Sequence, residues 1–295
     1  MLDKNVKVTT MSGEKNQAIL PRLRSVYQDL TKSEQRIASY IMENAAKIME
    51  QTIPELAANT KSSEITISRF CKKLGFSGLQ GLKIALAAEL STAGEMEFRE
   101  IGEKDTDEQV AAKVFQNIMD GLQDTLKILD FQQVARAVQV LQGARRVAVY
   151  GFGNSATVCK DIETRFMRFG MAIQSYADMS QQLTSASLLT NDDVVIAVSH
   201  TGATIKLLES VRVAKKAGAK VIVITSYAQS NLAKLGDVVL TGMGREVHYS
   251  SESVASRLIH MAISDVLYTA LARSNPKGYH ENIAKMRSVI AETRE

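Results

Sequence analysis

Five short apolar runs, spread over residues 146–242, constrain the fold of this 295-residue chain more than any other feature. Stretches of helical periodicity separate them, near residues 156–168, 179–188 and 204–217. Continuous β-branched strands that alternate with helices are typical of a parallel sheet covered on both faces. The runs VAVYG, AIQSY, DVVIAVS, KVIVITS and DVVLTG therefore predict a doubly wound α/β domain.

The first third of the chain has a different pattern, because its apolar residues recur at helical spacing and no alternating strand is visible. A capping box at Thr31 and Glu34 predicts one helix, whose inward face extends to Ile48. The change of pattern predicts two domains joined by a polar connector. We expect an all-α domain over residues 1–90, a linker over residues 91–109, and the α/β domain with flanking helices over residues 110–295.

Two short helices follow within the all-α domain. The first has Pro54 in its first turn, where a missing amide costs nothing. The second, in SEITISRFCKKLGF, is capped by Ser62 or Ser63 and ended by Gly75. A polar turn over residues 59–62 separates them, and the second helix has a basic outer face. This arrangement indicates a helix-turn-helix.

The positive charge of the chain is concentrated in the same region. Residues 1–93 carry 13 basic and 9 acidic side chains, whereas the remainder carries 23 of each, so the net charge of +4 belongs to the first third. Such an excess suits a phosphate backbone, although a solvated face that only keeps a helical hairpin soluble is the alternative. Arginine can fork onto a guanine edge and lysine neutralises phosphates. We expect the DNA contacts to come from Ser63, Glu64, Thr66, Ser68, Arg69, Lys72 and Lys73.

Two loops that follow strands are rich in glycine, serine and threonine. The first loop, residues 151–155, reads GFGNS, and the second loop, residues 199–204, reads SHTGAT. Ligands of parallel sheets bind outside the carboxyl ends of the strands, and each loop opens a helix whose free amides favour an anion. We therefore expect one phosphate to be bound by Gly151, Gly153, Asn154, Ser155, Ser199, His200, Thr201, Gly202 and Thr204.

A dinucleotide site is the competing interpretation of the first loop. Gly151, Gly153 and Ala156 match the G-x-G-x-x-G/A fingerprint, and Asp178 lies near the end of the next strand. A dinucleotide site does not need a second hydroxyl-rich loop, whereas a phosphate shared by two loops does. Tight turns alone would account for one such loop but explain both poorly.

The two loops resemble the sugar isomerase (SIS) domain, a phosphosugar-binding module with the patterns G-x-G-x-S and S-x-[ST]-G-x-T. Separately, TISRFCKKLGFSG, from Thr66 to Gly78, resembles the helix-turn-helix of RpiR-type transcriptional regulators, and the order of the two modules matches that family. The resemblance implies a DNA-binding regulator of sugar metabolism whose second domain binds a sugar phosphate that modulates operator binding. It also implies a homodimer or homotetramer on a palindromic operator.

A sugar-phosphate isomerase with an accessory basic domain is the alternative function. Isomerisation needs a general base, and Glu252, His200, His248 and His260 are the candidates. Glu252 lies in about the region where SIS enzymes often have a glutamate that acts as the general base. A glutamate at a helix N-terminus is, however, also a common capping residue, and the helix dipole stabilises its charged form. The fused DNA-binding module favours sensing. We therefore expect no enzyme, and we expect Glu252 and Ser253 to contact sugar hydroxyls.

The remaining expectations concern metals, location and assembly. Cys71 and Cys159 lie far apart with no neighbour that completes a zinc pattern, so we expect neither a metal nor a cofactor. The polar first residues and the lack of an 18-residue apolar run predict a cytoplasmic protein without a membrane partner. Apolar positions near the end of the chain serve either a dimer surface or the core, namely Val254, Leu258, Met261, Ile263, Val266 and Leu267.

Overall fold

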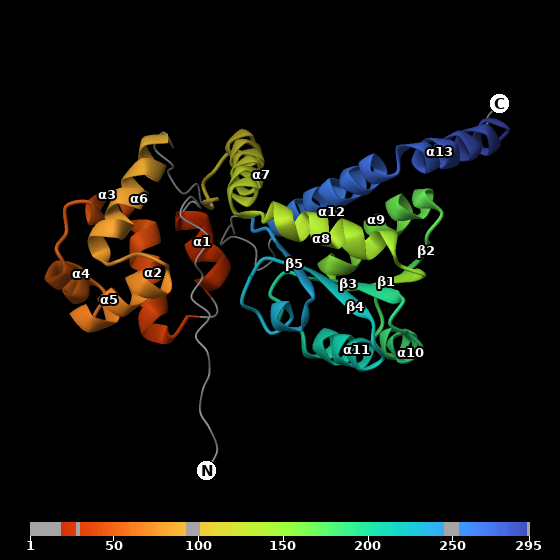
Figure 1. The fold of residues 1–295 in the computed structure, drawn as a ribbon. Coiled ribbons are helices and arrows are strands. Elements are labelled where there is room, and N and C mark those ends of the chain that lie inside the picture. Colours follow the sequence, from red (N-terminus) through yellow and green to blue (C-terminus); the bar gives the residue numbers. More distant parts are fainter. Residues whose placement is uncertain (1–18, 28–29, 93–100, 245–253, 294–295) are drawn as a thin grey trace, which may run out of the picture. The chain divides into compact units, whose positions relative to one another are not determined.

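The computed structural model describes residues 19–27, 30–92, 101–244 and 254–293. The chain divides into two compact units, residues 1–97 and 98–295, each with a core of its own (Figure 1). Helices overlap both ends of the expected linker, because one helix ends at Thr92 and the next begins at Asp107. The domain bounds expected from the sequence stay a prediction.

The described part of the first unit is helical throughout. Its core is built around Leu23, Ile37, Phe70 and Leu82, all fully buried. The capping box at Thr31 forms, but the helix expected to extend to Ile48 ends at Glu43 and a separate short turn of helix follows. The helices are α1 (Ile19–Val26), α2 (Lys32–Glu43), α3 (Ala45–Ile48), α4 (Ile53–Asn59), α5 (Glu64–Lys73) and α6 (Leu79–Thr92).

The break after α2 has a local cause. Asn44 caps α2, and both its backbone amide and its side-chain amide donate to the Tyr40 carbonyl, at 2.9 and 3.2 Å. Asparagine side chains compete with the helical ladder in this way, so the apolar spacing continues while the helix does not. The expectation of one uninterrupted helix was therefore wrong.

The second unit is an α/β fold whose strands all run parallel. The sheet order is β2-β1-β3-β4-β5, and all seven residues of the central strand β3 are buried. The doubly wound sheet expected from the sequence is confirmed. Its strands are β1 (Arg146–Tyr150), β2 (Ala172–Tyr176), β3 (Asp193–Ser199), β4 (Lys220–Thr225) and β5 (Val238–Thr241).

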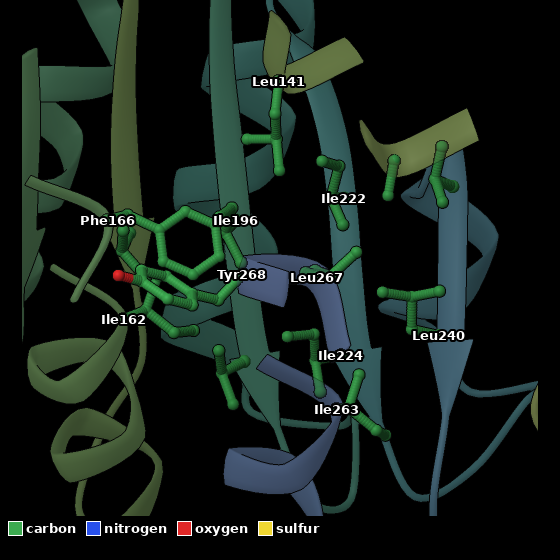
Figure 2. Packing of buried hydrophobic residues seen from close by; sticks show 14 of the residues in the cluster. Leu141, Ile162, Phe166, Ile196, Ile222, Ile224, Leu240, Ile263, Leu267 and Tyr268 are labelled. Atoms are coloured by element: carbon green, nitrogen blue, oxygen red, sulfur yellow. The ribbon is translucent and has the colours of Figure 1, made fainter. Parts of the chain in front are cut away.

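Helices cover both faces of this sheet (Figure 1). On one face, strand residues such as Ile196, Ile222 and Ile224 pack against Ile263 and Leu267 (Figure 2). On the other face the core is smaller, built around Val195, Val223 and Val211 among others. The helical elements are α7 (Asp107–Ile128), α8 (Phe131–Gln142), α9 (Asn154–Phe166), η2 (Met167–Phe169), α10 (Met179–Ser187), α11 (Ile205–Lys216), η3 (Ala233–Leu235), α12 (Val254–Ser274) and α13 (Pro276–Ala291).

The apolar residues of α12, for which the sequence left core and dimer surface open, fall into two groups. Ile263 and Leu267 belong to the core, whereas Val266 is exposed and Leu258 and Met261 are partly buried. The burial of Val254 is not described. Among the described residues, no helix is both long enough and apolar enough to cross a membrane.

Helix α7 has the reverse of the usual amphipathic pattern. Its buried face holds the polar residues Asn117, Asp124 and Thr125 together with Gly121. Its outward face holds four large apolar side chains, which are 68, 47, 39 and 64% exposed respectively: Phe115, Met119, Leu122 and Leu126. We name these four residues the α7 stripe.

A buried carboxylate ties the start of β3 to the chain segments beside it. One Asp193 oxygen accepts hydrogen bonds from the Arg145 guanidinium and the Thr190 amide, both at 2.8 Å, and lies 3.2 Å from Arg146 Nε. Burial alone would raise the pKa of Asp193, but the bonds from Arg145 and Thr190 outweigh it, so this pKa lies below its ordinary value.

Replacing Asp193 with alanine should therefore destabilise the second unit, by about 1–3 kcal/mol near neutral pH. Because the folded-state pKa is depressed, the carboxylate stabilises the fold above the pKa of an unfolded aspartate and ceases to do so as the pH falls through the folded value. Hydrogen exchange of the β3 amides measures the effect within this unit. Asp192→Ala, at the exposed neighbouring position, is the control, and equal effects of the two variants would contradict the prediction.

Candidate functional site

The two glycine-rich and hydroxyl-rich loops follow neighbouring strands. Strands β1 and β3 are paired in register, with Tyr150 opposite Ala197, so the first and second loops leave the same edge of the sheet. The sheet order reverses direction between these two strands, since β2 lies beyond β1 and β4 lies beyond β3. Open parallel sheets bind ligands at such a switch point. The topology thus brings together the two loops that the sequence singled out.

The first loop is shaped by two glycines. Gly153 has φ 53° and forms the N-cap of α9. A Cβ atom on Gly151 would lie 2.6 Å from Cys159 Sγ and 3.1 Å from the Ser155 backbone, so only glycine fits there. Cys159 is thus a packing residue beneath the loop, and burial raises the pKa of its thiol. Ser155 is half-buried and Asn154 is exposed at the start of α9.

The second loop is held by its own side chains. Ser199 is buried, and its Oγ accepts a hydrogen bond from the Gly202 amide at 3.1 Å. Thr201 Oγ1 accepts one from the Ala203 amide at 3.3 Å. Gly202 is buried with φ 61°, and a Cβ there would overlap the Ser230 hydroxyl. Thr204 is the N-cap of α11.

A third loop, residues 225–232 after β4, supports the second loop and was missed in the sequence. Its Ser226 amide and Thr225 Oγ1 both donate to the His200 carbonyl, at 3.1 and 3.2 Å, and its Leu232 amide donates to the Gly202 carbonyl at 3.0 Å. The signal was present, because KVIVITSYAQS also places hydroxyl residues after a buried strand.

The helices that begin at the first and second loops share a feature of their N-termini. Neither α9 nor α11 has a side chain that caps its first-turn amides. Seven helices elsewhere do have such a cap, from Thr31, Thr52, Ser63, Thr106, Asp130, Asp178 and Asn275. Among the helices of at least seven residues whose N-cap is described, only α9 and α11 lack a side-chain cap, and these are the two helices that begin at the switch point. Uncapped helix N-termini favour an anion.

His200 is not a free surface side chain. Its Nδ1 lies 2.8 Å from Ser226 Oγ, which in turn lies 3.1 Å from Nε2 of His260 on α12. Ser226 and His260 are buried. Burial lowers the pKa of His260 to about 3, with a further contribution from His200, so this ring is neutral. Three side chains thus form a continuous chain from the second loop to α12.

The helix-turn-helix geometry in the first unit is also present. Ser63 caps α5 by accepting a hydrogen bond from the Thr66 amide at 3.1 Å, and Gly75, with φ 85°, follows the helix. Arg36 donates to the carbonyls of Thr60 and Lys61, both at 3.3 Å, and so fixes the turn between α4 and α5. Burial raises the pKa of the Cys71 thiol on the inner face to about 11.

Most of the expected DNA-contacting residues lie on the outer face of α5. Exposed or half-buried positions are Ser63, Glu64, Thr66, Ser68, Arg69, Lys72 and Lys73. Lys73, however, bonds both carboxylate oxygens of Glu34 at 3.0 Å, so part of its charge is neutralised within the unit. Ile65, to which no role is assigned from the sequence, is also largely exposed on the same helix. Apolar side chains can contact thymine methyl groups.

Comparison with known proteins decides the family. The model for the helix-turn-helix domain of the rpiR family matches residues 17–93, and the SIS domain model matches residues 140–270. An uncharacterized HTH-type transcriptional regulator of Caldanaerobacter subterraneus subsp. tengcongensis is 31% identical over 92% of this chain and 97% of its own length. The chain belongs to the rpiR family of helix-turn-helix transcriptional regulators.

One solved structure and one longer relative are also similar to this chain. The structure of the Vibrio vulnificus NanR protein complexed with ManNAc-6P is 29% identical, covers 93% of this chain and 98% of that chain, and has a TM-score of 0.60. The bifunctional protein glk of Paraburkholderia xenovorans is 34% identical over 95% of this chain, but the chain spans only 44% of that relative. The resemblance to RpiR-type regulators found in the sequence is confirmed.

Some expected site residues of this rpiR-family chain are not placed. Glu252 and Ser253, expected on the sugar hydroxyls, and His248 lie outside the described residues. Among the residues that are described, no group of three or more histidine, cysteine, aspartate or glutamate side chains is arranged to hold a metal ion. The individual phosphate, sugar and DNA contacts stay predictions.

Gly202 offers a direct check of how the second loop is held. Gly202→Ala should destabilise the second unit more than Gly153→Ala does. Both residues have positive φ, 61° and 53°, so an alanine is strained at either position, but only the Gly202 variant also meets Ser230. Hydrogen exchange in α11 and β4 measures the difference. Equal losses for the two variants would show that contact with the third loop does not constrain Gly202.

Proposed function

We propose that this rpiR-family protein regulates transcription of sugar-metabolism genes, and that a sugar phosphate bound at the switch point of its second unit modulates operator binding. The observation that carries the proposal is the meeting of two uncapped helix N-termini, α9 and α11, at the carboxyl ends of β1 and β3. A phosphate group supplies negative charge, which the positive ends of two helix dipoles favour. The bound ManNAc-6P of the NanR structure supports this ligand class.

The proposed phosphate contacts follow from the loop geometry. Main-chain amides at the start of α11 would donate to the phosphate, with hydroxyls from Ser155, Thr201 and Thr204 around it. The Ser199 oxygen already accepts a hydrogen bond from the Gly202 amide, so we expect the Ser199 hydroxyl to donate its proton to the ligand. Glu252 and Ser253 are proposed for the sugar hydroxyls.

Sensing is favoured over catalysis by the architecture of the chain. The helix-turn-helix unit has no role in isomerisation, and the regulator of Caldanaerobacter matches over both units. The bifunctional relatives are more than twice as long as the part that matches here, so their activities belong to whole proteins that this chain spans in part. A DNA-binding role also agrees with the expected cytoplasmic location.

Two substitutions should separate the two functions of the protein. Ser155→Ala should weaken the response to a sugar phosphate about tenfold or more while leaving operator affinity unchanged, because it removes one hydroxyl at the first loop. Arg69→Ala should weaken operator binding and leave sugar-phosphate binding unchanged, because it removes a base or phosphate contact. Gel-shift titration on DNA upstream of the gene, with and without hexose 6-phosphates, and thermal shift measure the two affinities.

The outcome that opposes this proposal is equally clear. Absence of salt-sensitive DNA binding, combined with turnover of a phosphosugar that Glu252→Gln abolishes, would support the isomerase instead. Thr157→Ala is a matched control for Ser155→Ala. The Thr157 side chain lies exposed on the first turn of α9, where its hydroxyl donates to the Asn154 carbonyl at 2.7 Å.

We further propose that the regulator self-associates through the α7 stripe. Its members are separated by four, three and four residues, the spacing of a coiled-coil seam, on a helix whose other face is committed to the core. A second copy of the chain presents the same seam, and antiparallel pairing would place Leu126 against the partner copy's equivalent of Phe115. It would also direct the acidic first turn of α7 towards the basic last turn of the other copy. Helix-turn-helix dimers read two-fold symmetric operators, which supplies the reason for two copies.

The double substitution Leu122→Glu and Leu126→Glu should lower the assembly to a monomer, because like charges would then meet in an apolar seam. Sedimentation velocity gives the mass. Leu188→Glu, at a leucine of the second unit about as exposed as Leu126, is the control and should leave the mass unchanged. An unchanged mass for the double variant would contradict the proposal. An unchanged mass with loss of stability in the first unit would assign the stripe to that unit instead.

A further inference from the structure

The outward side of helix α5 combines one apolar side chain with two cations. Ile65 is 71% exposed, the largest fraction among the large apolar side chains that the structure describes. Arg69 and Lys72 are also exposed, and their spacing from Ile65, four and seven residues, places all three on one side of the helix. The opposite side holds the buried Ile67 and Phe70. We name Ile65, Arg69 and Lys72 the α5 outer line.

The polar side chains at the two ends of α5 are largely committed within the first unit. Ser63 Oγ lies 2.8 Å from Thr66 Oγ1 and accepts a hydrogen bond from the Thr66 amide at 3.1 Å. Lys73 is paired with Glu34 over 3.0 Å. Within the described residues, by contrast, the Arg69 guanidinium makes neither a hydrogen bond nor an ion pair. The α5 outer line is therefore the part of this helix that is available to a partner.

Ile65 occupies the part of the helix-turn-helix that reads base pairs. It is the second residue of α5, and the N-terminal residues of the second helix in this motif contact base edges in the major groove. Most groups on those edges are hydrogen-bond donors or acceptors, but the C5 methyl group of thymine is apolar and is contacted by apolar side chains. Ile65 therefore has a matching group in the groove.

The charges beside Ile65 favour DNA over a protein partner. Ile65 is the one exposed apolar side chain of α5, whose residues are all described, and protein interfaces use larger apolar patches than a single side chain. Arg69 and Lys72 on the same line attract the phosphates of a duplex. An apolar side chain flanked by cations thus matches a methyl group flanked by phosphates.

We propose that Ile65 is a specificity-determining residue of operator binding, and that its side chain contacts the C5 methyl group of a thymine in the major groove. Arg69 and Lys72 supply attraction to the duplex, whereas Ile65 distinguishes thymine from cytosine, which lacks this methyl group. The inference rests on the proposed DNA-binding function. It adds an apolar contact to the set expected from the sequence, in which every residue is polar.

The test uses the full-length protein and a duplex that the protein itself selects. Wild type first selects its preferred sequence from random duplexes. Each thymine of that sequence is then replaced in turn by deoxyuridine, which lacks only the C5 methyl group. Replacement of the thymine that Ile65 contacts should weaken binding by wild type about fourfold, the amount expected for burial of one methyl group. The other replacements measure any effect of deoxyuridine itself.

The Ile65→Ala variant should bind the selected duplex about tenfold more weakly than wild type. It should lose no further affinity when the contacted thymine becomes deoxyuridine, because the methyl group then has no partner to lose. Its affinity for random duplex should stay within twofold of wild type, with the same salt dependence, because no charge is removed. Ile84→Ala, at an isoleucine that is 64% exposed on α6, is the matched control and should bind every duplex as wild type does.

The outcomes separate the inference from the function on which it rests. If wild type selects no sequence, the proposed operator binding itself fails. If wild type selects a sequence but Ile65→Ala binds it equally well, or remains sensitive to every deoxyuridine that weakens wild type, the inference is overturned and the regulator stands. The inference is also overturned if Ile65→Ala weakens selected and random duplexes equally. A change of mass in sedimentation velocity would place Ile65 in an interface between copies, which equally overturns it.

Discussion

The convergence of two helix N-termini that lack a side-chain cap, those of α9 and α11, is the constraint around which the second unit is organised. Parallel strands place all their carboxyl ends at one edge, and the order β2-β1-β3-β4-β5 places the ends of β1 and β3 side by side. Two positive helix ends therefore converge, and no side chain of their own N-caps neutralises them. The cost of leaving these helix ends without a cap is tolerable where an anion takes that place. The third loop keeps the arrangement rigid, because its Leu232 and Ser226 amides hold the second loop by its carbonyls.

The sequence was most informative where one physical rule dominates. Buried parallel strands are runs of β-branched residues, so the strands were predicted correctly, and the two loops rich in glycine and hydroxyls do follow β1 and β3. Their phosphate contacts stay a prediction. The end of α2 was predicted wrongly because the apolar spacing continues to Ile48. That spacing does not reveal that the Asn44 side chain competes for a helical carbonyl. The third loop was overlooked because its hydroxyls act on backbone carbonyls of another loop, and that contact depends on strand order, which composition does not encode.

Two other features depend on tertiary structure alone. Residues 200, 226 and 260 are far apart in the chain, and the hydrogen bonds among them exist only because β4 lies beside β3 in the sheet and α12 packs against one face of that sheet. The reversed pattern of α7 is equally hidden, since its apolar residues have ordinary helical spacing and only burial shows that Asn117 and Asp124 point inward while Phe115 and Leu126 do not. A periodicity locates an apolar face but does not say whether that face meets the core or a partner.

The histidine chain also bears on why this SIS scaffold suits sensing. In catalytic triads, a buried carboxylate behind the histidine stabilises the imidazolium that forms when the ring acts as a base. Here, within the described residues, the group behind His200 is the neutral hydroxyl of Ser226, backed by a His260 whose pKa burial lowers to about 3. Such a chain does not stabilise a positive charge. Within the described residues, this chain of side chains therefore lacks the buried carboxylate that supports a histidine base in a triad.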